Sequence, residues 1–194
     1  MMTIVKIIAS AILLMPCACA FKKLQTLIDE PASANAPRLA VAITNLVIVD
    51  GRATVDTRDV KTSKLAAPGR TDLISPAISQ AHKDMLEKEM AWYSNGGASG
   101  PHAACTIQVV EGVERYKSTW SGEEMHARSK LRVSIVDSVH APFVFSTVGE
   151  AEYYFTSNIA NQSNFDRLYQ KAMKTALFKA VESLSGALDT AARR

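Results

Sequence analysis

Two alternating segments in the second half of the chain constrain its fold most. They are residues 125–137 and 142–156. Apolar and polar side chains alternate in both segments, which is typical of strands with one buried face. A hairpin that pairs Ile135 with Phe145 buries one face of both strands. The same register pairs Lys130 with Glu150 on the outer face, so both faces predict one antiparallel hairpin.

The outer face of this hairpin carries a row of basic side chains. The row comprises His126, Arg128, Lys130 and Arg132. The predicted register places Glu152 opposite Arg128, so part of the row faces acidic partners. Lys and Arg outnumber Asp and Glu by only 22 to 19 in the whole chain, which is far from the basic surplus that nucleic-acid binding requires. We therefore expect a solvated, charge-paired sheet face and no nucleic-acid partner.

Two other segments have the composition of strands. A β-branched run at residues 38–50 predicts the first strand of the domain. A bulge at Asn45 would let the apolar residues after it continue to face the core. Residues 102–117 predict a further strand. Between them, the polar stretch at residues 51–71 is expected to be a long loop, a place where a binding surface could lie.

Helix signals complete the pattern. Ser75 followed by Pro76 predicts a helix that runs to about Tyr93. Ser163 and Asp166 resemble a capping box that opens the C-terminal helix. We expect an α+β fold, with a mostly antiparallel sheet of about four strands and two helices packed on one of its faces. The expected order along the chain is β-α-β-β-β-α.

The N-terminus has the organisation of a secretory signal. Lys6 precedes an apolar run that ends at Met15 and is followed by small residues. From Ile4 the run is 12 residues long, whereas a helix needs about 20 residues to cross a bilayer. We therefore expect residues 1–20 to be a secretory signal, residues 21–37 to be a tether and residues 38–194 to form a single domain.

Two ways of processing this signal are open. Ala18 and Ala20 form an A-x-A cleavage site, which would release a soluble protein that begins at Phe21. Alternatively, Cys19, or less readily Cys17, is lipidated and becomes the new N-terminus. Cysteines next to an apolar signal are unusual in an oxidising compartment, where they invite wrong pairing. We favour the lipoprotein, exported to the periplasm and anchored in the outer membrane.

No motif of catalytic chemistry is found in the sequence. The histidines have no metal-ligand spacing and fall in different predicted elements: His82, His102, His126 and His140. Cys105 lies in an apolar strand-like run, where a cysteine usually acts as a small buried hydrophobe. A nucleophile elbow of the G-x-S-x-G type is absent from the sequence. We expect no enzymatic activity, no cofactor and no metal site.

The order of elements resembles the YajG-type outer-membrane lipoproteins. The resemblance covers nearly the whole mature chain as an order of elements. Its most sequence-like part is the stretch Val47-Ile48-Val49-Asp50-Gly51-Arg52, which has the form V-x-V-D-x-R. The resemblance implies a non-enzymatic periplasmic domain, anchored at the inner leaflet of the outer membrane, that binds other envelope components.

Binding is therefore the expected mode of action. The candidate interaction surface comprises Arg52, Arg58, Arg128, Lys130, Arg132 and Tyr154. The expected partners are envelope proteins or lipids, with membrane attachment through Cys19 if this residue is acylated. The alternative is a soluble periplasmic module that binds a small molecule or peptide, either on the outer sheet face or beneath the loop at residues 51–71.

Overall fold

A computed structural model describes residues 37–59, 69–94, 102–120, 122–137, 144–157 and 162–192 of the chain, with side chains to residue 188. The predicted signal and nearly all of the predicted tether lie outside the described residues. The helices and strands, in chain order, are β1 (Ala42–Asp50), β2 (Thr71–Ile74), α3 (Gln80–Tyr93), β3 (His102–Thr119), β4 (Gly122–Asp137), β5 (Val144–Ser157) and α4 (Gln162–Ala192).

The sheet has five strands and is mixed, not mostly antiparallel. Its main path is β1-β3-β4-β5, and β2 pairs with β3 on the same edge as β1 but further along the strand. β1 runs parallel to β3, whereas all other pairs are antiparallel. The expected four-stranded, mostly antiparallel sheet is wrong on both points. Helix α3 in the connection between β1 and β3 carries the chain back, so that β3 can start at the same end as β1.

The extra strand lies within the long polar connection that follows β1. β2 comprises Thr71, Asp72, Leu73 and Ile74, and pairs with β3 from Glu114 to Lys117. This segment mixes polar and apolar side chains over only four residues, too short a stretch for an alternating pattern to stand out. The observed order is therefore β-β-α-β-β-β-α.

The predicted register of the long hairpin is confirmed. Ile135 pairs with Phe145, and Lys130 pairs with Glu150. The bulge predicted near Asn45 is also present, because the register between β1 and β3 shifts between Ile43 and Asn45. These two results follow from the same rule, since a one-residue slip would turn every apolar side chain of a strand toward water.

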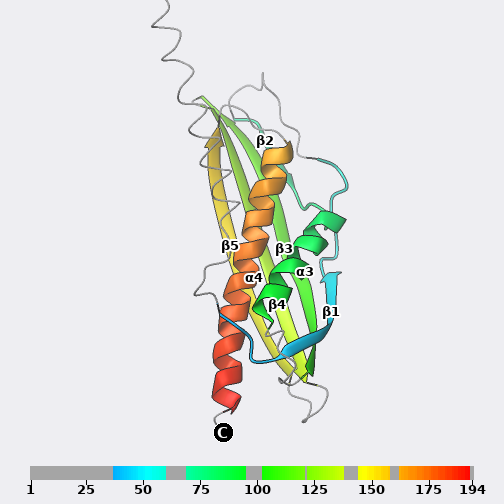
Figure 1. Ribbon diagram of the computed structural model, residues 1–194. Coiled ribbons are helices and arrows are strands. Elements are labelled where there is room, and N and C mark those ends of the chain that lie inside the picture. Colours follow the sequence, from blue (N-terminus) through cyan, green and yellow to red (C-terminus); the bar gives the residue numbers. More distant parts are fainter. Residues whose placement is uncertain are drawn as a thin grey trace, which may run out of the picture.

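Both helices lie on one face of the sheet, as predicted, and α4 lies along its long axis (Figure 1). α3 begins at Gln80 rather than after Ser75, because Ser79 is its N-cap and forms a capping box with His82. α4 begins at Gln162, so Ser163 lies inside it. None of the helices in the described part of the chain combines the length and apolar character of a membrane span.

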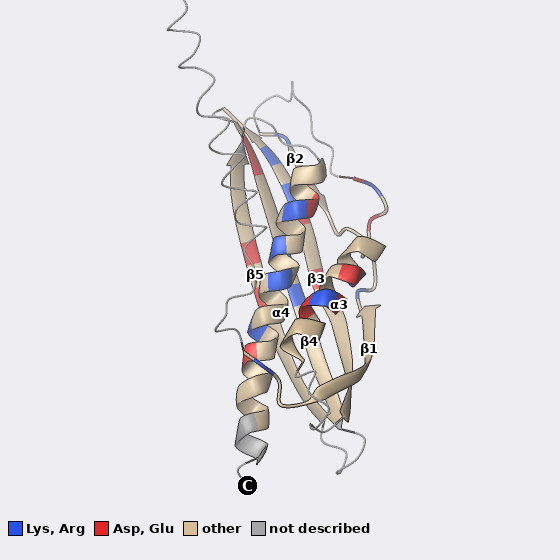
Figure 2. Cartoon of the chain, in the orientation of Figure 1, with Lys and Arg blue, Asp and Glu red and all other residues tan. Residues whose placement is uncertain are grey.

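The core fills the space between the helices and the sheet. Its large and fully buried side chains include Tyr116, Tyr169, Phe165, Leu86, Met90, Ile107, Leu131 and Ile135. Charged side chains of both signs occur on α4 and on the strands (Figure 2). The sheet face opposite the helices is not covered by any described element (Figure 1).

Candidate functional site

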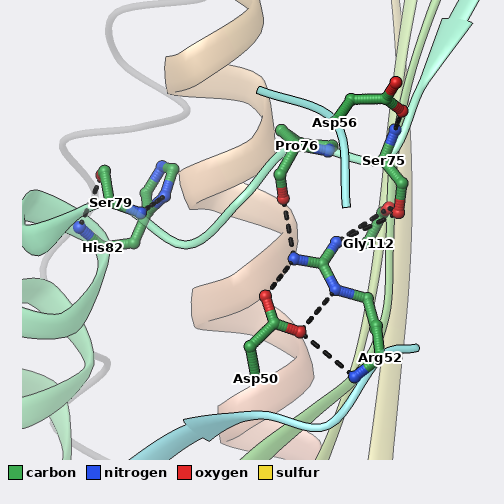
Figure 3. A network of polar contacts seen from close by, with 8 residues as sticks. All are labelled: Asp50, Arg52, Asp56, Ser75, Pro76, Ser79, His82 and Gly112. Carbon is green, nitrogen blue, oxygen red and sulfur yellow. Dashed lines mark hydrogen bonds and ion pairs between the residues drawn. The ribbon is translucent and has the colours of Figure 1, made fainter. Parts of the chain in front are cut away.

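The V-x-V-D-x-R stretch ends in an ion pair. Arg52 Nη2 lies 2.5 Å from Asp50 Oδ2, and Arg52 Nε donates to Asp50 Oδ1 at 2.7 Å (Figure 3). Hydrogen bonds from Arg52 hold the pKa of the Asp50 carboxyl below its usual value. The planar guanidinium matches the two carboxylate oxygens of Asp50, a fit that lysine cannot reproduce.

Arg52 also joins three separate segments of the chain. Its guanidinium donates to the Pro76 carbonyl at 2.7 Å and to the Gly112 carbonyl at 3.2 Å. A further hydrogen bond, of 3.2 Å, reaches Ser75 Oγ (Figure 3). Only 6% of the Arg52 side chain is exposed. Arg52, which was expected on an interaction surface, therefore lies inside the fold and connects the ends of β1 and β2 to β3.

A pocket of about 270 Å³ adjoins this network on the helix side of the sheet. It lies among the first turns of α3 and α4, the end of β2, part of β3 and the segment after β1. The residues that line it include Asp56, Arg58, Asp59, Ile74, Pro76, Ala77, Ser79, His82, Glu114, Gln162 and Asp166. Segments far apart in the sequence thus meet at one concave site. Small-molecule sites are usually concave.

Glu114 is the unusual residue of this pocket. The residue is only 1% exposed, and its Oε2 atom has no hydrogen-bond partner. Burial, together with the nearby carboxylates of Asp166 and Asp59, raises the pKa of Glu114 to about 7. Because the folded protein holds this proton more tightly than the unfolded chain, the contribution of Glu114 to stability falls as the pH rises from about 4.5 to about 7.

The other titratable groups of the pocket have internal roles. The His82 ring accepts a hydrogen bond from the Ser79 backbone N–H and packs edge-on against Tyr169. Burial lowers the pKa of His82, so the ring stays neutral. Arg58 lies at the exposed side of the pocket, where Nη1 is 2.8 Å from Asp72 Oδ2. Asp56 Oδ2 accepts a hydrogen bond from the Ser75 backbone N–H.

The remaining predicted surface residues lie together on the opposite, uncovered face of the sheet. Arg128 contacts Glu150 at 2.5 Å and Glu111 at 3.4 Å, while Lys130 lies 3.6 Å from Glu150. Arg132 donates to Gln108. These pairs hold the basic row in a charge-paired arrangement.

Tyr154 belongs to a small cluster on the same face. Its ring stacks on His126 with centroids 4.4 Å apart, and its hydroxyl donates to Glu152. The His126 ring also lies 2.6 Å from Glu152. Arg128, Lys130, Arg132 and Tyr154 therefore share one face, whereas Arg52 and Arg58 lie apart from it. The predicted processing residues Cys17, Ala18, Cys19 and Ala20 lie outside the described residues.

The described residues contain neither an activated cysteine nor a metal-binding cluster. Cys105 is buried, and burial raises the pKa of its thiol to about 12. A thiol with such a pKa is a poor nucleophile. No group of three or more His, Cys, Asp and Glu residues in the described part of the chain could hold a metal ion.

Comparison with solved structures finds similar bacterial proteins. A minor lipoprotein from Acinetobacter baumannii is 9% identical, with a TM-score of 0.35 over 79% of this chain and 94% of that chain. A protein from Caulobacter crescentus CB15, provisionally described as a lipoprotein, is 14% identical, with a TM-score of 0.38 over 61% of this chain and 88% of that chain. A Xanthomonas campestris protein is 14% identical, with a TM-score of 0.38 over 81% of this chain and 92% of that chain.

No protein-family model and no curated protein matches the sequence. TM-scores of 0.35 to 0.38 are too low to carry an argument about function. None of these three proteins is described as a YajG-type protein, so that resemblance stays a prediction. The function of this chain has to be argued from its own residues.

Proposed function

We propose that this protein is a non-enzymatic lipoprotein of the cell envelope that binds an envelope protein through the uncovered face of its sheet. The N-terminal sequence supports export, and Cys19 is the proposed lipid carrier. The outer membrane is the proposed site of attachment, with the domain in the periplasm. The observation that carries the binding role is a group of exposed valines on the uncovered face.

The patch spans the strands at the end of the sheet where β1 begins. Its valines are 37% to 64% exposed and come from three strands. They are Val47 and Val49 on β1, Val136 on β4, and Val144 and Val148 on β5. Thr106, Ser134 and Ser146 lie beside Val47 in one row across the strands. In the next row, Gln108 and Arg132 lie between Val49 and Val148. Exposed apolar side chains that gather on one uncovered face are typical of a protein interaction site.

The charges beside the patch favour a protein over a lipid surface. Arg128 and Lys130 are both paired with Glu150, so the face has little surplus positive charge to attract anionic head groups. A flat arrangement of Val, Ser and Thr side chains matches the face of another sheet or a helix with small residues. We therefore propose an envelope protein with a flat apolar surface as the partner.

Site-specific photo-cross-linking in the native host tests this proposal. A photoreactive amino acid at Val148 should give a discrete protein adduct, because this side chain is 43% exposed within the patch. The same amino acid at Glu87, an exposed position on α3, serves as the control and should give none. Lipid adducts alone at Val148, or the same adducts from both positions, would contradict a protein partner on this face.

A further inference from the structure

We propose that the pocket beside Arg52 is a second binding site, which takes a small aliphatic amine with a protonated end against Glu114. This site is independent of the proposed partner surface, because it lies on the helix side of the sheet. The charges, the unpartnered carboxylate and the apolar lining of the pocket each support this assignment.

The pocket is strongly acidic. Its lining has four carboxylates, namely Asp56, Asp59, Glu114 and Asp166, and Arg58 is the only Lys or Arg side chain among its described residues. The Arg58 guanidinium lies 2.8 Å from Asp72, which does not line the pocket, and 3.9 Å from Asp56, which does. Acidic side chains in a partly enclosed site attract cations more strongly than the same charges do in open water.

Glu114 provides an unfilled hydrogen-bond acceptor in this pocket. Its Oε2 atom has no donor, although the residue is 1% exposed. A buried acceptor without a partner costs free energy, and most such groups in proteins are satisfied by protein, water or ligand. An ammonium group carries three N–H donors and a positive charge, so it supplies the hydrogen bond that Glu114 Oε2 lacks and a charge opposite to that of the carboxylate.

The remainder of the lining suits a short alkyl chain. Ile74, Pro76 and Ala77 place apolar surface in the same pocket, where it can contact methylene groups. Asp59 belongs to the more exposed segment after β1, so it can accept a second ammonium group. Asp56, in the same segment, already pairs with Arg58 and accepts from the Ser75 backbone N–H. The volume of about 270 Å³ is just below the range of pockets that hold drug-sized ligands, so the ligand must be small. A short diamine is therefore the ligand class that the pocket fits.

Binding should strengthen as the pH rises through 7. Asp166 and Gln162 on α4, Asp59 after β1 and the neutral His82 on α3 are the groups around Glu114 in the pocket. Burial, with the charges of Asp166 and Asp59, raises the pKa of Glu114 to about 7 in the empty pocket. Only the ionised carboxylate forms an ion pair with the ammonium group, so a more acidic buffer should weaken the complex.

Calorimetric titration of the full chain in detergent with 1,4-diaminobutane tests the site. At pH 8 and fixed ionic strength we expect saturable binding to one site. Glu114→Gln keeps the shape of the side chain but removes its charge, and should weaken binding by about tenfold or more. Glu87→Gln removes a charge from the exposed part of α3 and should leave the affinity unchanged.

The folding of the variants is checked by circular dichroism and thermal unfolding. Without ligand, Glu114→Gln should melt at a higher temperature than the original chain at pH 8, because it removes a buried charge. Asp166→Asn is a second pocket variant and should also weaken diamine binding. The proposal is overturned if the original chain shows no saturable binding at pH 8, or if Glu114→Gln and Asp166→Asn both bind as tightly as Glu87→Gln.

Discussion

Replacing Arg52 with alanine should lower the free energy of unfolding by about 2–4 kcal/mol. The guanidinium of Arg52 is nearly buried and binds Asp50, Ser75 and two backbone carbonyls. Without it, the carboxylate of Asp50 loses its ion-pair partner, and the Pro76 carbonyl loses a donor. Urea unfolding followed by circular dichroism measures the loss.

Two further variants distinguish the loss of this hydrogen-bond network from the loss of a positive charge alone. Arg52→Lys keeps the positive charge but cannot contact all of these acceptors at once. Its stability should therefore lie between those of Arg52→Ala and the original chain. Arg70→Ala removes an exposed guanidinium and should change stability by no more than about 0.5 kcal/mol. Equal stabilities for Arg52→Ala and Arg70→Ala would show that the network does not hold the ends of β1 and β2 to β3.

Gly149→Ala should destabilise the fold by about 3 kcal/mol or more. Gly149 lies on β5 where α4 approaches most closely, and an added Cβ atom would lie 1.8 Å from the Ala176 carbonyl oxygen and 2.7 Å from the Ala180 backbone nitrogen. These are backbone atoms of a long helix, so they cannot move aside as a flexible side chain could. The helix would have to shift away from the sheet. Thermal unfolding would show this as a lower midpoint.

Gly186→Ala is the matched control, because it makes the same chemical change within α4 itself. An added Cβ atom at Gly186 meets nothing within 4 Å. Alanine is favoured over glycine in a helix interior, so this variant should gain about 0.5–1 kcal/mol. Opposite signs for the two variants would support the close packing of α4 on β5. A similar small change in both would contradict it.

The sequence predicted the hairpin and the helix-covered sheet because each rests on a repeated pattern. In β4 and β5 the apolar alternation and the charge pairs agree on one register, as in the pairing of Ile135 with Phe145 and of Lys130 with Glu150. The direction of β1 relative to β3 has no such signature. Apolar alternation reads the same in a parallel and an antiparallel strand, so the mixed sheet could not be predicted.

A site beneath residues 51–71 was one of the predicted alternatives, but the role of Glu114 in the pocket was missed for a related reason. Up to Val109, the odd-numbered residues of β3 face the core, as the alternation predicts. A register shift between Val109 and Glu111 reverses this, so that Glu114 and Tyr116 are buried instead. A bulge turns the side chains beyond it to the other face. Tyr116 could have revealed the register shift, because without the shift this aromatic side chain would face water.

The two proposed sites divide the molecule by face. The proposed partner surface is the group of exposed valines on the uncovered side of the sheet, whereas the proposed amine site is the pocket around Glu114 on the helix side. The Arg52 network lies next to the pocket and fixes Ser75 and Pro76 at its edge. Each of the two proposals can therefore be tested without the other.

Mass spectrometry of the mature N-terminus, purified from the native host, tests the central claim most directly. The lipoprotein account predicts a chain that begins at Cys19 with a diacylglyceryl group on its sulfur. A chain that begins at Phe21 without lipid would contradict the anchor and favour a soluble periplasmic module. An intact chain beginning at Met1 would contradict export itself.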